Sequence, residues 1–261
     1  MFDLKRLVLG ILILLMFTAP VGVNAFSPPR ALAKNQALLL SSLNETNPMG
    51  YYAKDTIFYL RKAGYNVTYL TDGAVTVDLL LNRLTNYNVV IWRTNSFTWR
   101  HVTYWYVGEK INDGVEEKYA SNFTAGWMNA NTGIVGVSVD FFAFYFRPDT
   151  LHGVGILMFM ASDGNAVAPI LYGAGVSAVI FCNGSISLQF GLVDDLSVQI
   201  VSYLAQGESV YYAVYDTVSP FSQGQQMQLK DPLDTTYAPP FWFFGDSTLT
   251  ISAGVVHAKG H

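Results

Sequence analysis

The chain has 261 residues and a formal net charge of −4, and only 13% of its residues are charged, about half the usual share. Because its basic residues form no cluster, nucleic acids and anionic membranes are poor partners for it. Its single cysteine excludes an intrachain disulfide and a cysteine-based zinc site.

Residues 1–25 have the pattern of a secretory signal peptide. Lys5 and Arg6 precede an apolar run at 7–17, and residues 23–25 offer a small-x-small cleavage pattern. A membrane span needs about 20 apolar residues, so the run favours a signal, with an uncleaved anchor as the alternative. We therefore predict a secreted protein with no membrane span beyond this signal.

Residues 26–261 are long enough for one domain, and no interior linker divides them. Alternating strands and helices are predicted first, at 36–42, 51–63, 65–70, 76–84 and 88–94. This βαβαβ order predicts a parallel sheet with helices on both faces.

The next part of the chain is predicted to be an insertion, around 97–132. Residues 96–107 are aromatic and β-prone, which fits a strand extension or an edge strand. Residues 109–131 mix charges, Gly and Asn, as in a long loop over the strand ends with hairpin content. Residues 133–145 are apolar and β-prone again.

A second βαβ unit is predicted at 154–184, with strands at 154–160 and 177–182 around a short helix at 166–172. Both strands are unbroken apolar runs, which is typical of strands that are buried on both faces. In open parallel sheets, chemistry occurs beyond the carboxyl ends of the strands. The turns that follow these two strands are therefore the first place to look for a site.

The C-terminal part is predicted to contain two helices, at 188–206 and 208–217, followed by a polar loop at 220–240. Short strands at 241–244 and 248–251 precede a loose tail. Together the elements predict a three-layer α/β/α sandwich with a mostly parallel sheet of about six strands.

Four segments in this order resemble caspase-fold peptidases of the gingipain, clostripain and CHAT type. The segment 88–96 (NVVIWRTNS) is similar to the strand and turn that carry the catalytic His, and 156–164 (ILMFMASDG) to those that carry the catalytic Cys. Residues 170–184 and 241–251 (FWFFGDSTLTI) are similar to the next helix–strand unit and to the closing Gly-Asp segment. The turn Val107-Gly108-Glu109 is similar to one in archaeal secreted members.

The departures from this family matter most for function. The position of the catalytic His is Asn95, and that of the nucleophilic Cys is Ala161. The Gly before the Cys is replaced by Met160, and the Pro after Gly-Asp by Ser247. Because a carboxamide cannot relay a proton and a methyl group cannot attack a carbonyl, the resemblance implies a scaffold without its chemistry.

Three residues could replace the lost pair. Ser162, with Asp163 beside it, follows the Cys position, but it also suits a turn that bonds its own backbone. Cys182 ends the neighbouring strand and is more typical of a buried thiol. His101 lies six residues beyond Asn95 in an aromatic stretch, where a surface position is the simpler interpretation.

Other polar residues are candidates for binding. In the family an acidic residue near Asp194 and Asp195 helps to bind a basic side chain, although acidic residues early in a helix also favour its dipole. Asp163 and Asn183 follow the two central strands. No EF-hand spacing links the aspartates, so no metal or cofactor is predicted. Sequons at four positions suggest glycosylation: Asn44, Asn66, Asn122 and Asn183.

The sequence thus predicts a secreted pseudo-peptidase that binds a peptide, protein or glycan, or that takes part in a cell-surface assembly. An active hydrolase with Ser162 or Cys182 as nucleophile is the alternative. A structural surface protein without a ligand cleft is the third possibility.

Overall fold

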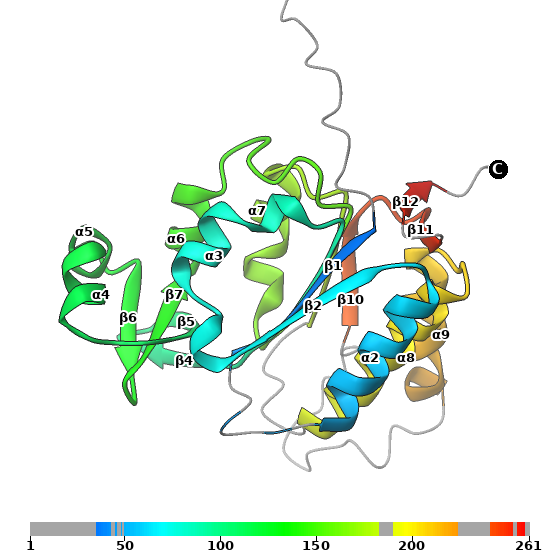
Figure 1. Ribbon diagram of the computed structural model, residues 1–261, viewed down its shortest axis with the longest axis horizontal. Coiled ribbons are helices and arrows are strands. Elements are labelled where there is room, and N and C mark those ends of the chain that lie inside the picture. Colours follow the sequence, from blue (N-terminus) through cyan, green and yellow to red (C-terminus); the bar gives the residue numbers. More distant parts are fainter. Residues whose placement is uncertain are drawn as a thin grey trace, which may run out of the picture. The chain divides into compact units, whose positions relative to one another are not determined.

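A six-stranded sheet lies at the centre of the computed structural model, in the order β10-β9-β8-β3-β1-β2 (Figure 1). The structure describes residues 35–42, 45, 48, 50–182, 190–223, 241–252 and 255–258. The predicted signal lies outside these residues. The strands of the sheet are β1 (Gln36–Ser41), β2 (Asn66–Thr71), β3 (Val89–Arg93), β8 (Ile156–Met160), β9 (Ala178–Cys182) and β10 (Phe241–Gly245). Neighbouring strands are parallel, except that β10 is antiparallel to β9.

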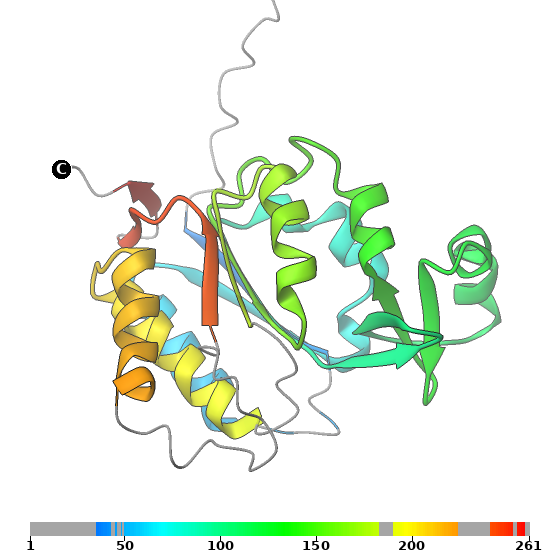
Figure 2. The same cartoon turned by 180° about the vertical axis from the view of Figure 1, so that it is seen from behind.

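Helices cover both faces of this sheet, which confirms the predicted three-layer α/β/α class (Figures 1 and 2). One face packs against α2 (Gly50–Lys62), α8 (Phe190–Ala205) and α9 (Val210–Gln223). The opposite face packs against α3 (Val77–Asn82), α6 (Val139–Tyr145) and α7 (Ala168–Gly173).

Successive side chains of each central strand enter opposite core clusters. In β3, Val89 and Ile91 contact the α2–α8–α9 side, whereas Val90 and Trp92 contact the other side. All five residues of β3 are buried, which explains why the sequence shows an unbroken apolar run there rather than an alternating one.

The insertion forms a second, antiparallel sheet in the order β4-β5-β7-β6. Its strands are β4 (Ser96–Trp99), β5 (Val102–Lys110), β6 (Met128–Asn131) and β7 (Ile134–Ser138), with the short helices α4 (Asp113–Lys118) and α5 (Ala120–Thr124) between β5 and β6. The stretch 96–107 is therefore a hairpin of its own sheet, and not an edge strand of the central one.

Three predictions of secondary structure need correction. The β-prone stretch 133–145 is a strand only as far as Ser138 and then becomes α6, because Phe141 and Phe142 are buried in the core as helical neighbours. Helix α9 continues to Gln223, beyond the predicted end at 217. The tail contains β12 (Val255–Ala258), which pairs with β11 (Leu249–Ser252).

Gly108 lies within β5, where the pairing with β7 is irregular, and its backbone approaches Asp72, which follows β2. Its φ of 114° is in the region that favours glycine, and a Cβ there would collide with the backbone carbonyl oxygen of Asp72. This close approach places Glu109 so that its Oε2 accepts a hydrogen bond of 2.9 Å from the Val77 N–H at the start of α3.

Among the described helices, none has both the length and the apolar character that a membrane crossing requires.

Candidate functional site

A small pocket lies beyond the carboxyl ends of the central strands. It has a volume of about 20 Å³, which is room for about one water molecule. It is lined by Arg93, Thr94, Asn95, Met160, Ala161, Ser162, Cys182, Val193 and Asp194. The chain reverses its direction of sheet growth between β1 and β3, and ligands of doubly wound sheets bind beside such a switch point. The pocket is therefore the candidate functional site.

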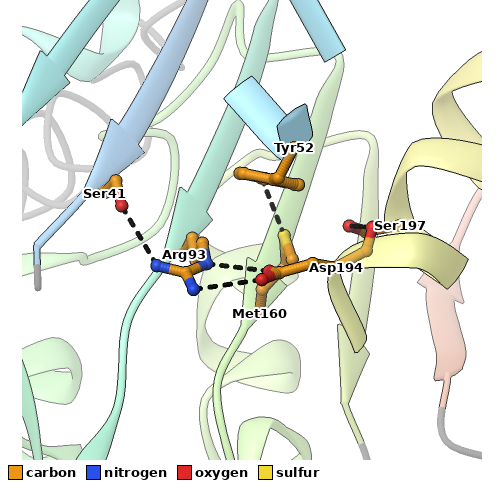
Figure 3. A network of polar contacts seen from close by, with 6 residues as sticks. All are labelled: Ser41, Tyr52, Arg93, Met160, Asp194 and Ser197. Carbon is orange, nitrogen blue, oxygen red and sulfur yellow. Dashed lines mark hydrogen bonds and ion pairs between the residues drawn. The ribbon is translucent and has the colours of Figure 1, made fainter. Parts of the chain in front are cut away.

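A buried ion pair forms one wall of this pocket (Figure 3). Arg93, the last residue of β3, donates from Nε to Asp194 Oδ1 at 2.8 Å and from Nη2 to Oδ2 at 3.0 Å. The side chain of Arg93 is 3% exposed and that of Asp194 is fully buried. Two parallel bonds of this kind make a planar, charge-assisted fork that joins β3 to α8.

Further contacts hold the guanidinium in place. Its Nη1 donates to Ser41 Oγ at the end of β1, at 3.3 Å. Its centre lies 5.7 Å from the ring centroid of Tyr52 on α2, within the range of a cation–π contact. The Tyr52 hydroxyl in turn donates to Met160 Sδ at the end of β8, at 3.0 Å (Figure 3).

Burial dominates the electrostatics of the site. It raises the pKa of the Asp194 carboxyl above its ordinary value, and the hydrogen bonds from Arg93 oppose this rise by favouring the charged form. Burial also raises the pKa of the Cys182 thiol far above its usual range, although a backbone N–H from Ala161 opposes the change. The thiol therefore keeps its proton at neutral pH.

The two positions that the resemblance aligns with a catalytic His and Cys lie on adjacent strand ends. Asn95 and Ala161 both line the pocket, and the Thr94 N–H bonds the Met160 carbonyl oxygen at 3.1 Å between them. The Oδ1 of Asn95 accepts from the Ser96 N–H at 2.8 Å, so this carboxamide is used in its own turn. The tips of β3 and β8 thus carry a bonded amide and a methyl group.

The three replacement candidates do not assemble into a reactive set. Ser162 lines the pocket, and its backbone carbonyl oxygen accepts from Trp105 Nε1 at 2.8 Å. Cys182 also lines the pocket but is 1% exposed. His101 is exposed in the turn between β4 and β5, and it is not among the residues that line the pocket.

The structure separates the acidic candidates. The Asp194 carboxylate is not available to a basic ligand, because Arg93 of the same chain bonds both of its oxygens. It also lies beyond the first turn of α8, which begins at Phe190, so the helix dipole does not explain it. Asp195 is exposed, and Asp163 is partly exposed in a left-handed turn outside the pocket lining.

The sequons differ in their surroundings. Asn66 is exposed at the start of the edge strand β2, as a glycan acceptor must be. Asn122 is 3% exposed, and its Oδ1 accepts from the Tyr145 hydroxyl at 3.0 Å, so the fold leaves little room for a glycan there. Asn44 and Asn183 lie outside the described residues.

Sequence reasoning missed the residues that organise the site, namely Arg93, Ser41 and Tyr52. One signal was present, because Arg93 ends an otherwise apolar strand that is buried on both faces. A charge in such a position needs a buried partner, and this requirement could have linked it to an aspartate in a predicted apolar helix.

No group of three or more His, Cys, Asp or Glu side chains among the described residues is arranged to hold a metal ion. No protein-family model matches the chain, and no curated protein matches it either.

Proposed function

We propose that the protein is a secreted, catalytically silent relative of the caspase-fold peptidases, whose strand-end site serves binding or assembly at the cell surface. The observation that carries the proposal is the Arg93–Asp194 ion pair, which occupies the end of β3 beside the pocket. Next to it, Asn95 and Ala161 supply an amide and a methyl group in place of a base and a nucleophile.

The chemistry of the pocket argues against a displaced nucleophile. Covalent hydrolysis needs a hydroxyl or thiol that an adjacent base can activate. Ser162 and Cys182 are present, but no histidine is among the lining residues, all of which lie in the described part of the chain. The Asp194 carboxylate is committed to Arg93, and burial keeps the Cys182 thiol protonated.

The partner that this proposal implies is a peptide, a protein or a glycan. Charged residues are scarce in the chain. Several aromatic side chains are exposed, among them Phe58 at 58% and Trp99 at 55%. Surfaces with few charges and several aromatic side chains suit extended contacts.

The test is to incubate the purified protein with fluorogenic peptides that end in Arg or Lys, and with thiol- and serine-directed covalent probes. The proposal expects no hydrolysis above background and no labelling of Ser162. Hydrolysis that disappears in Ser162→Ala or Cys182→Ala, or covalent labelling of Ser162, would instead establish an active hydrolase.

A further inference from the structure

The sheet and the helix contribute opposite charges to the site. Ser41 ends β1 and Arg93 ends β3, so the two strands at the switch point together present a hydroxyl and a guanidinium. The anion that meets them, Asp194, comes from α8, a later element of the chain. In doubly wound sheets, a group in this position is commonly a ligand rather than part of the protein.

The guanidinium is held in place by groups other than Asp194. Ser41 Oγ accepts from Nη1, and the Tyr52 ring centroid lies 5.7 Å from the centre of the group. The backbone of Arg93 is fixed as well, because its carbonyl oxygen accepts from the Ser42 N–H at 3.1 Å. Nε and Nη2 then point together at a single carboxylate, which is the arrangement that arginine uses for planar anions. The cation and its supporting groups therefore form a prepared cradle.

The pocket extends this cradle. Arg93 and Asp194 share its lining with the polar residues Thr94, Asn95 and Ser162. The pocket has a volume of about 20 Å³ and is lined by Asp194. Withdrawal of the Asp194 side chain would therefore join the pocket to the space that the carboxylate now fills.

We propose that Arg93 and Ser41 form a carboxylate-binding site, and that Asp194 occupies it in this structure as an internal plug. A molecule that carries a carboxylate group competes with Asp194 for the Arg93 fork and releases the start of α8 from the pocket. This inference rests on the binding role proposed above and names the chemical class of the ligand.

The first experiment empties the cradle. In Asp194→Ala, acetate should restore the lost pairing and raise Tm by about 3 °C for each tenfold increase above its Kd. Acetamide, which has the same shape without the charge, should have no such effect. The double variant Arg93→Met/Asp194→Ala should also fail to respond. An equal response to acetate in the single and double variants, or none in either, would refute the cradle.

The second experiment uses the wild-type chain and holds even where Asp194→Ala does not fold. Cys182 is the only cysteine of the sequence and lines the same pocket, so its rate of labelling by 4,4′-dithiodipyridine reports on access. Acetate should accelerate labelling several-fold relative to acetamide at equal ionic strength. Equal rates would mean that Asp194 is a fixed structural partner and not a plug.

Neither readout measures hydrolysis. Peptidase activity would overturn the proposed function and leave these binding results intact. A failure of acetate would overturn the plug and leave the absence of catalysis unaffected.

Discussion

At the scale of single residues, the site is governed by the balance between desolvation and pairing. Two charged groups that leave water lose several kcal/mol each, and a good fork geometry repays much of this loss. The raised pKa of Asp194, which burial causes against the opposing effect of Arg93, indicates that desolvation is the larger influence. A pair of this kind contributes specificity of arrangement more than net stability.

This balance predicts opposite outcomes for single and double substitutions. Arg93→Met leaves a buried carboxylate without its partner and should lower the free energy of unfolding by about 3–5 kcal/mol. The double variant Arg93→Met/Asp194→Leu should be as stable as the wild type, or more stable by up to about 4 kcal/mol. Urea denaturation measures both.

The matched control for these variants is Asp195→Asn, an exposed neighbour in the same helix, which should change stability by less than about 0.5 kcal/mol. A double variant that is clearly less stable than the wild type would contradict the interpretation.

The thiol of Cys182 gives the site a dependence on pH. The pKa of the thiol is raised in the folded protein, mainly by burial. In the unfolded chain the thiol ionises at about pH 8.5. Above that pH the unfolded state loses a proton that the folded state keeps, so stability falls as pH rises, by about 1.4 kcal/mol per pH unit.

Cys182→Ala removes this ionisation. The stability advantage of the wild type over Cys182→Ala should therefore shrink between pH 8 and pH 10, as measured by denaturation at several pH values. An advantage that stays constant over this range would show that the thiol ionises equally in both states.

At the scale of elements, the β4–β5 hairpin carries local strain. Its two-residue turn places Arg100 at a φ of 49° and His101 at 67°, in a conformation that Asn-Gly adopts more easily. The double variant Arg100→Asn/His101→Gly should stabilise the protein by about 1 kcal/mol, visible as a rise in Tm of about 2–4 °C. Arg100→Lys keeps the strain and should bring no gain.

A substitution at Gly108 in β5 should change stability in the opposite direction. Gly108→Ala adds both a left-handed strain and a collision with the Asp72 backbone, and should lower the free energy of unfolding by about 2–4 kcal/mol. Gly126 also has a positive φ, of 75°, but a Cβ there meets nothing within 4 Å. Gly126→Ala should therefore lose only about 1 kcal/mol. Equal losses would show that the close approach to Asp72 is easily relaxed.

At the scale of the whole molecule, the inner strands of the central sheet could be predicted because they are buried on both faces. The unbroken apolar runs of β8 and β9 are visible in the sequence of each strand alone. Helix α6 could not be predicted in the same way, because its aromatic residues favour strands locally and only the core makes them helical.

The position of the candidate site could be predicted from the sequence, but the ion pair beside it could not. The carboxyl ends of β3 and β8 follow from the topology, and Asn95 and Ala161 lie there. The ion pair joins residues 101 positions apart in the chain, and no local pattern specifies which side of α8 meets the end of β3. The fork between Arg93 and Asp194 therefore required the packed structure.

The strand order has a consequence for synthesis on the ribosome. After β1, β2 is added on one side, and β3, β8, β9 and β10 follow in turn on the other. The whole of the second sheet is translated between β3 and β8. Strand β3 therefore remains unpaired on its β8 side until residues 156–160 have been synthesised. A nascent chain halted before residue 156 would display β3 as an open edge, and misassembly between neighbouring polysomal chains should begin there.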